Sequence, residues 1–319
     1  MKRENRLDAD RLFDRVYKIF SYIAIVLVAI LFAFPLYWIV IGAFKPMKES
    51  YSVTPVWWPS EWVLVNFDKL MANRSAPLFD ITFKALQLKL GNLVFTLGKT
   101  ITITGPTVPA VFRWLVNTVF MAVASMLITC LTSAMAGYVL AKKRFWGRGI
   151  IFGLIVCAMA LPKQVVLIPL VRMMNGLGLY DNIWAVIFPI VGWPFGVFLL
   201  RQFSEGIPTE MVEACRIDGA SEWRTFTDVM FPMIKPGVGA LAIFTFVNSW
   251  NDYFMQLIML TSTKNLTISV GIATLQGESS TDIGILMAGA ALAAFPIIVV
   301  FLVFQKYFTK GITMGAVKG

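Results

Sequence analysis

Six long apolar stretches constrain this chain more than any other feature of its sequence. Each approaches the roughly 20 apolar residues that a helix needs to cross a hydrocarbon core about 30 Å thick. Hydrophobic residues make up 58% of the chain, well above the content of ordinary globular domains. We therefore predict an all-α polytopic membrane protein with six transmembrane helices, placed approximately at Phe20–Phe44, Trp114–Ala141, Ile150–Met173, Ile183–Arg201, Pro236–Leu260 and Ile285–Phe308.

The distribution of Lys and Arg predicts how these helices are oriented. Six basic residues lie in the tail formed by residues 1–19, four follow the second helix, and four belong to Arg201 and the polar stretch after it. The short loops that alternate with these regions hold only Arg172 and Lys264. By the positive-inside rule, both termini are expected in the cytoplasm. The tail is too long and too acidic for a signal peptide, so the first helix is expected to stay as an anchor.

The long segment between the first two helices, residues 45–113, is expected outside the cytoplasm. Within it Leu86–Leu90, Leu93–Leu97 and Thr100–Thr104 continue an alternation with a period of two, separated by the turn-forming pairs Gly-Asn and Gly-Lys. This pattern predicts a small three-stranded β meander. An irregular loop is the alternative.

The residue inventory excludes several kinds of chemistry. The chain has no histidine, three cysteines and no phosphate-cradling G-x-x-x-x-G-K-[ST] sequence. We expect no catalytic residues, no metal site and no cofactor bound by this chain. The net charge of +10 is attributed to basic residues on the cytoplasmic side of the bilayer and not to a nucleic-acid partner.

One polar stretch, EACRIDGASEWRTFTDVMFPMIKPG, stands between the apolar runs at Glu213 to Gly237. Pro208 suits an early helix position, Asp218-Gly219 breaks the helix, and Ser221 can cap a second short helix. Pro232 and Pro236 are expected to end that second helix and lead into the next span.

The two faces of this predicted helix–turn–helix differ in character. The apolar residues Trp223, Phe226, Val229 and Met230 recur at three- and four-residue spacing and are expected to pack on the protein's own helices. The charged face is expected to point to the cytosol and comprises Glu213, Arg216, Asp218 and Arg224. An interfacial loop without a partner is the alternative reading, but a helical hairpin centred on glycine favours a partner.

The polar stretch resembles the EAA signature of binding-protein-dependent ABC importer permeases. The Glu, Ala, Asp, Gly and Ala of that signature fall on Glu213, Ala214, Asp218, Gly219 and Ala220. Cys215 departs from the family's usual Ala, exchanging one small residue for another.

The resemblance extends over almost the whole chain. VLAKKRFWGRG resembles the family's basic loop, and LPKQVVLIPLVRMMNGLGLYDNIWAVIFP is similar to the third helix of the carbohydrate subfamily. FVNSWNDYF and YFTKGITMGAVKG resemble its fifth-helix segment and C-terminus. The most similar type is the smaller permease of maltose-like importers. About forty extra residues after NFDKL depart from that pattern.

The resemblance implies the type I ABC importer permease fold, with a domain at residues 20–319 and a cytoplasmic coupling loop at 202–235. It implies that the coupling helix sits in a groove of an ATP-hydrolysing subunit. Glu213 would pair with a basic residue there, Gly219 would permit the sharp turn, and Ala214 and Ala220 would allow close approach. Arg216 is expected to share in this contact, and Gly219 is expected to be essential because a side chain there would tilt the helix.

The implied assembly is an importer in a bacterial plasma (inner) membrane. Its expected partners are a second, different permease chain, two ATP-binding subunits that use ATP and Mg, and an extracytoplasmic solute-binding protein. The expected substrate is a carbohydrate, specifically an oligosaccharide. The chain itself is expected to catalyse no reaction.

Polar residues within the spans are candidates for the substrate pathway, because sugar hydroxyls need amide and carboxylate partners and sugar rings stack on aromatic side chains. The candidates are Asn248, Trp250, Asn251, Asp252, Tyr253 and, more weakly, Gln164. Hydrogen bonding between helices is the favoured explanation for those in the fifth span, because FVNSWNDYF could also end the helix at the outer surface. Pro162 and Pro169 are expected to kink the third helix.

Three other classes of function were considered. An ABC permease for a non-sugar solute differs from the preferred reading only in its substrate. A secondary transporter would need deep coupling carboxylates and paired broken helices, for which Asp252 is the one good carboxylate candidate. A channel would need a filter-like motif or a charged ring, and neither is found in the sequence.

Overall fold

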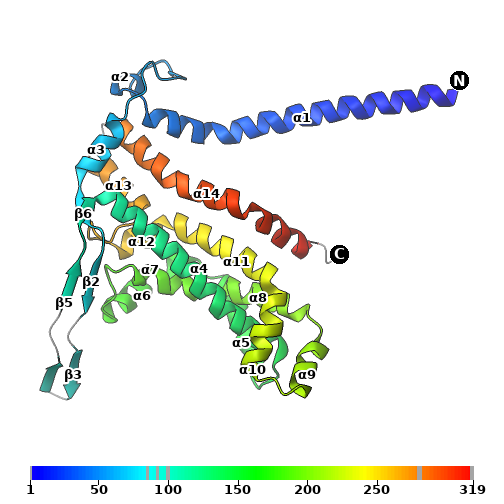
Figure 1. Ribbon diagram of the computed structural model, residues 1–319, viewed down its shortest axis with the longest axis vertical. Coiled ribbons are helices and arrows are strands. Elements are labelled where there is room, and N and C mark those ends of the chain that lie inside the picture. Colours follow the sequence, from blue (N-terminus) through cyan, green and yellow to red (C-terminus); the bar gives the residue numbers. More distant parts are fainter. Residues whose placement is uncertain (1, 84–85, 91–92, 98–100, 279–281, 317–319) are drawn as a thin grey trace. The chain divides into compact units, whose positions relative to one another are not determined.

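The computed structural model describes residues 2–83, 86–90, 93–97, 101–278 and 282–316 (Figure 1). Its helices are α1 (Lys2–Ala43), α2 (Met47–Ser50), α3 (Val65–Asn73), α4 (Ala110–Lys142), α5 (Arg148–Met159), α6 (Lys163–Gly176), α7 (Trp184–Val191), α8 (Pro194–Glu205), α9 (Thr209–Ile217), α10 (Glu222–Arg224), the π-helical η1 (Thr225–Met230), α11 (Phe231–Asn251), α12 (Tyr253–Met259), α13 (Ile268–Glu278) and α14 (Ile283–Ala316). Its strands are β1 (Ser75–Pro77), β2 (Asp80–Phe83), β3 (Leu86–Leu90), β4 (Leu93–Leu97), β5 (Ile101–Thr104) and β6 (Thr107–Pro109).

The predicted transmembrane helices are present, but the third of them is sharply bent. Within the described ranges, five stretches are long and apolar enough to cross a membrane: Phe13–Ala43, Ala110–Lys142, Trp184–Glu205, Glu222–Asn251 and Ile283–Phe304. A sixth span requires α5 and α6 together, and these two helices are bent by 106° at the break between them. The expected kink at Pro162 is thus a full break, whereas Pro169 lies inside α6.

The chain divides into two compact units, Met1–Leu70 with Ser279–Leu292 and Met71–Glu278 with Ala293–Gly319. In the first unit, the buried Asn66 closes the end of α1 by donating hydrogen bonds to the carbonyl oxygens of Ala43 and Lys45 at 2.9 and 3.0 Å. An ion pair of 2.7 Å between Lys69 and Asp282 joins α3 to the segment that leads into α14. The apolar side chains along α1 are mostly exposed, as expected of a helix that faces lipid.

The second unit is built around α4, which packs against α7, α8 and α11 (Figure 1). Small residues let α4 and α8 approach closely. A Cβ atom added at Gly196 would lie 2.4 Å from the Ser133 hydroxyl oxygen. One added at Gly137 would lie 2.7 Å from the backbone nitrogen of Arg201. The spacing of Ser133 and Gly137 therefore presents one narrow face of α4 to α8.

The other end of α4 holds the loop that precedes α13. The buried Trp114 donates its indole N–H to the carbonyl of Thr263 at 2.7 Å. Asn117 donates to the carbonyls of Lys264 and Leu266, each at 2.9 Å. These bonds satisfy backbone groups that the loop would otherwise bury without partners, so both ends of α4 carry structure beyond the helix itself.

The segment between β1 and β6 is a nested antiparallel ribbon and not the predicted three-stranded meander. The predicted hairpin of β3 and β4 is confirmed, with Leu88 opposite Phe95. The third predicted strand is wrongly placed, because β5 pairs with β2 and aligns Ile103 with Ile81. Strand β2 is itself an alternating run before the hairpin, and it offers β5 an apolar cross-strand partner. The predicted turns at Gly91-Asn92 and Gly98-Lys99 lie outside the described residues.

Hydrogen bonds to Asp181 connect the loop between α6 and α7 to the loop after α12. Its carboxylate accepts hydrogen bonds from the backbone N–H groups of Thr261 and Ser262 at 2.8 and 2.9 Å and from the Ser262 hydroxyl. Asp181 also has a positive φ of 56°, which Asp and Asn tolerate better than other side chains. Burial would raise the pKa of the Asp181 carboxyl, but hydrogen bonds from Ser262 and Thr261 outweigh it and hold the pKa below its ordinary value.

Asp181→Ala is therefore expected to lower the free energy of unfolding by about 2 kcal/mol, the scale of hydrogen bonds to a charged group. Because the folded-state pKa is depressed, this contribution is present above the unfolded pKa of about 3.9 and is lost as pH falls through the folded pKa. Thermal unfolding between pH 3 and pH 7 measures both effects. The Asp181→Asn variant keeps the tolerance for positive φ but lacks the charge. Equal acid sensitivity of the wild type and the Asp181→Ala variant would contradict the assignment.

Candidate functional site

The α9–α10 turn, residues 209–224, has the predicted helix–turn–helix form. Helix α9 ends at Ile217, and Gly219 then takes a φ of 76°. The Ala220 N–H returns to the carbonyl of Cys215 at 2.9 Å, which closes the last turn of the helix. Ser221 caps α10 by accepting a hydrogen bond from the Arg224 N–H at 3.3 Å. The breaking and capping roles predicted for Gly219 and Ser221 are confirmed.

The two faces of the turn also separate largely as predicted. Val212 and Phe226 are buried in a core that includes Tyr138 and Met230. The predicted charged face, comprising Glu213, Arg216, Asp218 and Arg224, is exposed. Trp223 is the exception, since 59% of it is exposed. The expectation that Trp223 is buried was wrong because the π-helical segment that follows changes the three- and four-residue spacing on which it relied.

Pro232 and Pro236 do not end the second helix, contrary to the prediction. Helical structure runs without a break from Glu222 to Asn251, with Pro232 in the first turn of α11 and Pro236 inside it. Proline lacks an N–H donor and clashes with the carbonyl of an ordinary preceding turn. The wider π-helical turn of η1, just before Pro232, is the kind of local adjustment that accommodates such a residue.

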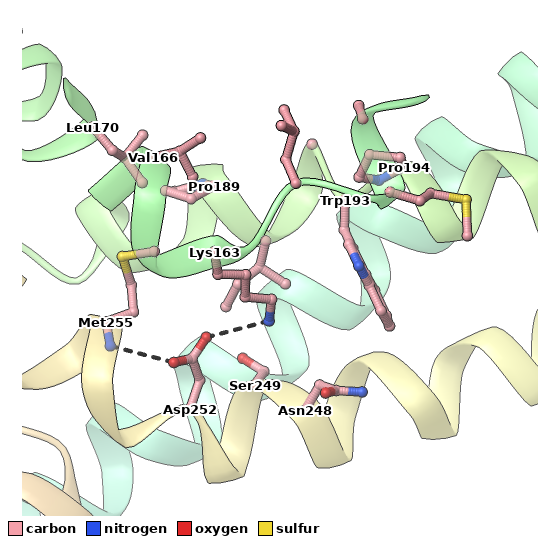
Figure 2. A pocket seen from close by; sticks show the side chains of 15 residues that line it. Lys163, Val166, Leu170, Pro189, Trp193, Pro194, Asn248, Ser249, Asp252 and Met255 are labelled. Atoms are coloured by element: carbon pink, nitrogen blue, oxygen red, sulfur yellow. Dashed lines mark hydrogen bonds and ion pairs between the residues drawn. The ribbon is translucent and has the colours of Figure 1, made fainter. Parts of the chain in front are cut away.

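A second candidate site is the break pocket, a cavity of about 390 Å³ lined by residues from α5, α6, α7, α8, α11 and α12 (Figure 2). Three interruptions of helical structure meet there: the break between α5 and α6, the residues Gly192-Trp193 between α7 and α8, and Asp252 between α11 and α12. Irregular backbone at membrane depth is tolerated where it lines a cavity. The cavity therefore explains how three interruptions of helical structure can be tolerated at this place.

Polar groups converge on this pocket from two sides. The Lys163 ammonium lies 3.7 Å from the Asp252 carboxylate and 5.7 Å from the centre of the Trp193 ring. Figure 2 shows Asn248 and Ser249 beside Asp252 on the neighbouring helix. The Asp252 carboxylate also accepts a hydrogen bond from the Met255 N–H at 3.3 Å, which caps α12. The Ser249 hydroxyl is buried and has no hydrogen-bond partner among the described residues.

The pocket thus offers an indole face, an amide, a hydroxyl and a pair of opposite charges within an otherwise apolar lining. Such a mixture suits a neutral ligand with many hydroxyl groups and apolar ring faces. Among the described residues, no group of three or more Cys, Asp or Glu side chains is placed to hold a metal ion.

A family model described as binding-protein-dependent transport system inner membrane component matches residues 133–314, more than half of the chain. The chain belongs to this family. The match begins within α4 and includes both the α9–α10 turn and the break pocket. The chain is therefore a multi-pass membrane component of a transport system, and we refer to it below as the permease.

The permease is similar along its whole length to named relatives. It is 31% identical to the arabinooligosaccharides transport system permease protein AraQ of Bacillus subtilis (strain 168), over 95% of this chain and 97% of that protein. It is 26% identical to the diacetylchitobiose uptake system permease protein NgcG of Streptomyces coelicolor, over 95% and 89%. A solved bacterial ABC transporter involved in the import of the acidic polysaccharide alginate contains a chain with the same fold, at a TM-score of 0.72, 20% identity and 92% and 97% coverage.

The structure brings only some of the predicted pathway residues of the permease to the pocket. Asn248 and Asp252 line it. Trp250 is buried in the core and stacks on Phe246 at 5.7 Å, so it stabilises helix packing. The remaining three candidates, all exposed and outside the pocket lining, are Gln164, Asn251 and Tyr253.

Two pocket residues were missed from the sequence. Neither Lys163 nor Trp193 was among the residues predicted for the substrate pathway. Each lies beside a helix break, Lys163 after Pro162 and Trp193 after Gly192. The Pro and Gly at these two positions were the available signal, because both residues mark interruptions in helices.

Proposed function

We propose that this chain is one transmembrane subunit of an ATP-driven importer for an oligosaccharide that an extracytoplasmic binding protein delivers. The named relatives supply the substrate class, since arabinooligosaccharides and diacetylchitobiose are both carbohydrates. The observation that carries the proposal is the break pocket. Its Trp193 ring can stack on a sugar face, while Asp252, Asn248 and Ser249 provide acceptors and donors for hydroxyl groups.

The α9–α10 turn is proposed to dock on a cytoplasmic ATP-binding subunit. Its exposed charged residues Glu213 and Arg216 would make the contact, and Gly219 would fix the turn that presents them. Ala214 and Ala220 would allow the partner's backbone to approach. Both termini would then lie in the cytoplasm, and the clusters of Lys and Arg in the N-terminal tail, after α4 and around the α9–α10 turn support this orientation.

Two ATP-binding subunits, which use ATP and Mg, would act on this chain and on a second permease chain. Closure of the ATP-binding subunits would displace α9 and change the access of the break pocket from one side of the membrane to the other. Only a difference in the binding of ATP between the two arrangements can drive this change. The role of this chain is then to bind and orient the sugar, without chemical reaction.

The substrate class is tested by measuring ATP hydrolysis in the complete complex reconstituted in liposomes with its binding protein. Stimulation by pentose or hexose oligosaccharides, with no response to amino acids, is the expected result. A complex that responds to amino acids or metal ions and to no glycan would overturn the carbohydrate assignment. It would leave the family membership intact.

Asp252→Asn is expected to raise the sugar concentration that gives half-maximal transport by about tenfold, since a hydrogen bond to a charged acceptor is roughly twice as strong as a neutral one. Asn retains the capping of α12, so thermal unfolding should change little. The matched control is Asn251→Ala, which removes an adjacent exposed side chain that bonds only to its own helix at the Val247 carbonyl among the described contacts. Equal effects of the two substitutions on transport would contradict the proposal that the sugar binds in the break pocket.

A further inference from the structure

The end of α4 contacts the start of α9 directly and the last turn of α9 through Glu222 of α10. At the start of α9, the Lys142 ammonium donates to the carbonyl of Ile207 and lies 3.5 Å from the Thr209 hydroxyl. The next residue, Lys143, forms an ion pair with Glu222, the first residue of α10. We refer to Lys142, Lys143 and Glu222 as the α4 clamp.

Glu222 is the centre of this clamp because both of its carboxylate oxygens are engaged. Oε2 accepts hydrogen bonds from the Tyr138 hydroxyl, at 3.1 Å, and from Lys143. Oε1 pairs with Arg216 in the last turn of α9 at 3.3 Å. One side chain thus joins the last turns of α4, the end of α9 and the start of α10.

The position of Glu222 matters because Gly219 lies between α9 and α10. Glycine has more conformational freedom than any other residue, and a Cβ at Gly219 would meet no atom within 4 Å. The φ of 76° at Gly219 and the shared core of Val212 and Phe226 hold the turn in its present form, but no side chain at Gly219 itself resists a change in the angle between the two helices. The contact between Arg216 and Glu222 spans this junction, and Tyr138, which is 4% exposed, supplies a rigid base for it.

We infer that Glu222 is a positioning residue that fixes α9 to the end of α4, so that a displacement of α9 moves α4 and is not absorbed at Gly219. The inference rests on the proposed function, because it assumes that a partner displaces α9. Helix α4 has 33 residues, about 50 Å at the usual rise per residue. Its far end holds the loop before α13 through Trp114 and Asn117, so a movement of α4 reaches the opposite end of the unit.

The exposure of Glu222 and Arg216 distinguishes a positioning role for Glu222 from a role in stabilising the fold. The side chains of Glu222 and Arg216 are 61% and 53% exposed, and exposed ion pairs contribute little to stability. Loss of the Glu222 charge should therefore leave thermal stability almost unchanged. Its effect should fall on the number of sugar molecules transported for each ATP hydrolysed.

The test compares Glu222→Gln, Lys143→Met and their double variant in the complete reconstituted complex. Glu222→Gln is expected to lower sugar transported per ATP about fivefold, the low end of measured couplings between sites. The double variant should match the single variants, since all three lose the same ion pair. Asp228→Asn is the control, because Asp228 is an exposed acid in the same helical stretch whose described hydrogen bond is to Thr227 at 2.7 Å. Unchanged stoichiometry in Glu222→Gln, or an equal loss in Asp228→Asn, would overturn the inference.

A second readout does not depend on sugar transport. In the full-length Cys157→Ser chain, the half-buried Cys215 reports on α9 while Cys130 is buried. Glu222→Gln should speed the labelling of Cys215 by a maleimide, and Asp228→Asn should not. No change in labelling would overturn the positioning role. Faster labelling in a complex that transports no glycan would retain that role and reject the proposed substrate.

Discussion

Gly137→Ala is expected to destabilise the protein by about 3 kcal/mol, at the upper end of the effect of overpacking a core. The new methyl group would lie 2.7 Å from the backbone nitrogen of Arg201 and 2.8 Å from the carbonyl carbon of Leu200. A flexible side chain can move away from such a contact, but the backbone of α8 moves only if the two helices separate. That separation would also disturb the contact between Ser133 and Gly196 one turn away.

The matched control gives an effect of the opposite sign. Gly153 lies in α5, and a Cβ there meets no atom within 4 Å. Gly153→Ala should therefore show only the gain in helix propensity, which is about 1 kcal/mol. Thermal unfolding of the purified protein in detergent measures both variants. A Gly137→Ala protein as stable as wild type would mean that α4 and α8 are not in close contact.

Gly219→Val is expected to reduce sugar transport to a small fraction of the wild-type rate while much of the ATP hydrolysis persists. A β-branched residue at a φ of 76° is strained by about 1–3 kcal/mol, and the turn would relax by reorienting α9. The family resemblance implies that a side chain here would tilt the helix in the groove of the partner subunit. Within the described chain the space around Gly219 is open, so the effect inside this subunit comes from the backbone.

Gly219→Asn distinguishes these two causes. Asn adopts positive φ far more readily than Val, so it adds a side chain without much strain. If backbone strain is the cause, proteoliposomes with Gly219→Asn should transport sugar at close to the wild-type rate. Equal loss in the Asn and Val variants would indicate instead that the partner subunit needs the empty space above Gly219.

The sequence predicted the transmembrane helices well because apolar length is a strong signal. It predicted their interruptions poorly. Gly192 and Asp252 lie inside apolar runs, and the hydropathy of such a run does not show whether its helix is continuous. Packing against the surrounding helices determines whether the helix breaks there. Pro232 and Pro236 predicted a helix end that is absent, because the π-helical turn of η1 accommodates proline within a continuous helix. Punctuating residues mark where a helix can change direction, while tertiary packing determines whether it does.

The two candidate sites differed in how far the sequence could define them. The α9–α10 turn was predictable because its chemistry is local: a glycine turn, a serine cap and the charges on one face all lie between Glu213 and Arg224. The break pocket joins Lys163, Trp193 and Asp252, which are separated by many residues along the chain. Trp250 and Asp252 are near neighbours in sequence, yet one is in the core and the other in the pocket. Only the tertiary arrangement of the breaks separates them.

The nested ribbon shows a similar limit. The hairpin of β3 and β4 follows from the local alternation of two adjacent segments, whereas the pairing of β5 with β2 joins strands that flank that hairpin. An alternating strand has no inherent preference between two such neighbours, so a local pattern cannot specify the order of strands.

The π-helical segment η1 has a consequence for how this transporter can diversify. It lies in the single helical run that begins at Glu222 in the α9–α10 turn and ends at Asn251, next to Asp252 in the pocket. Successive residues of an α-helix are rotated by about 100°, and a π turn accommodates one additional residue. The six residues of η1 therefore set the rotation of the α11 face at the pocket relative to the exposed face of the α9–α10 turn. None of the six lines the pocket or lies within residues 209–224. Gain or loss of one residue there would turn a different face of α11 toward the sugar, altering specificity without changing a single residue of the pocket or of the turn.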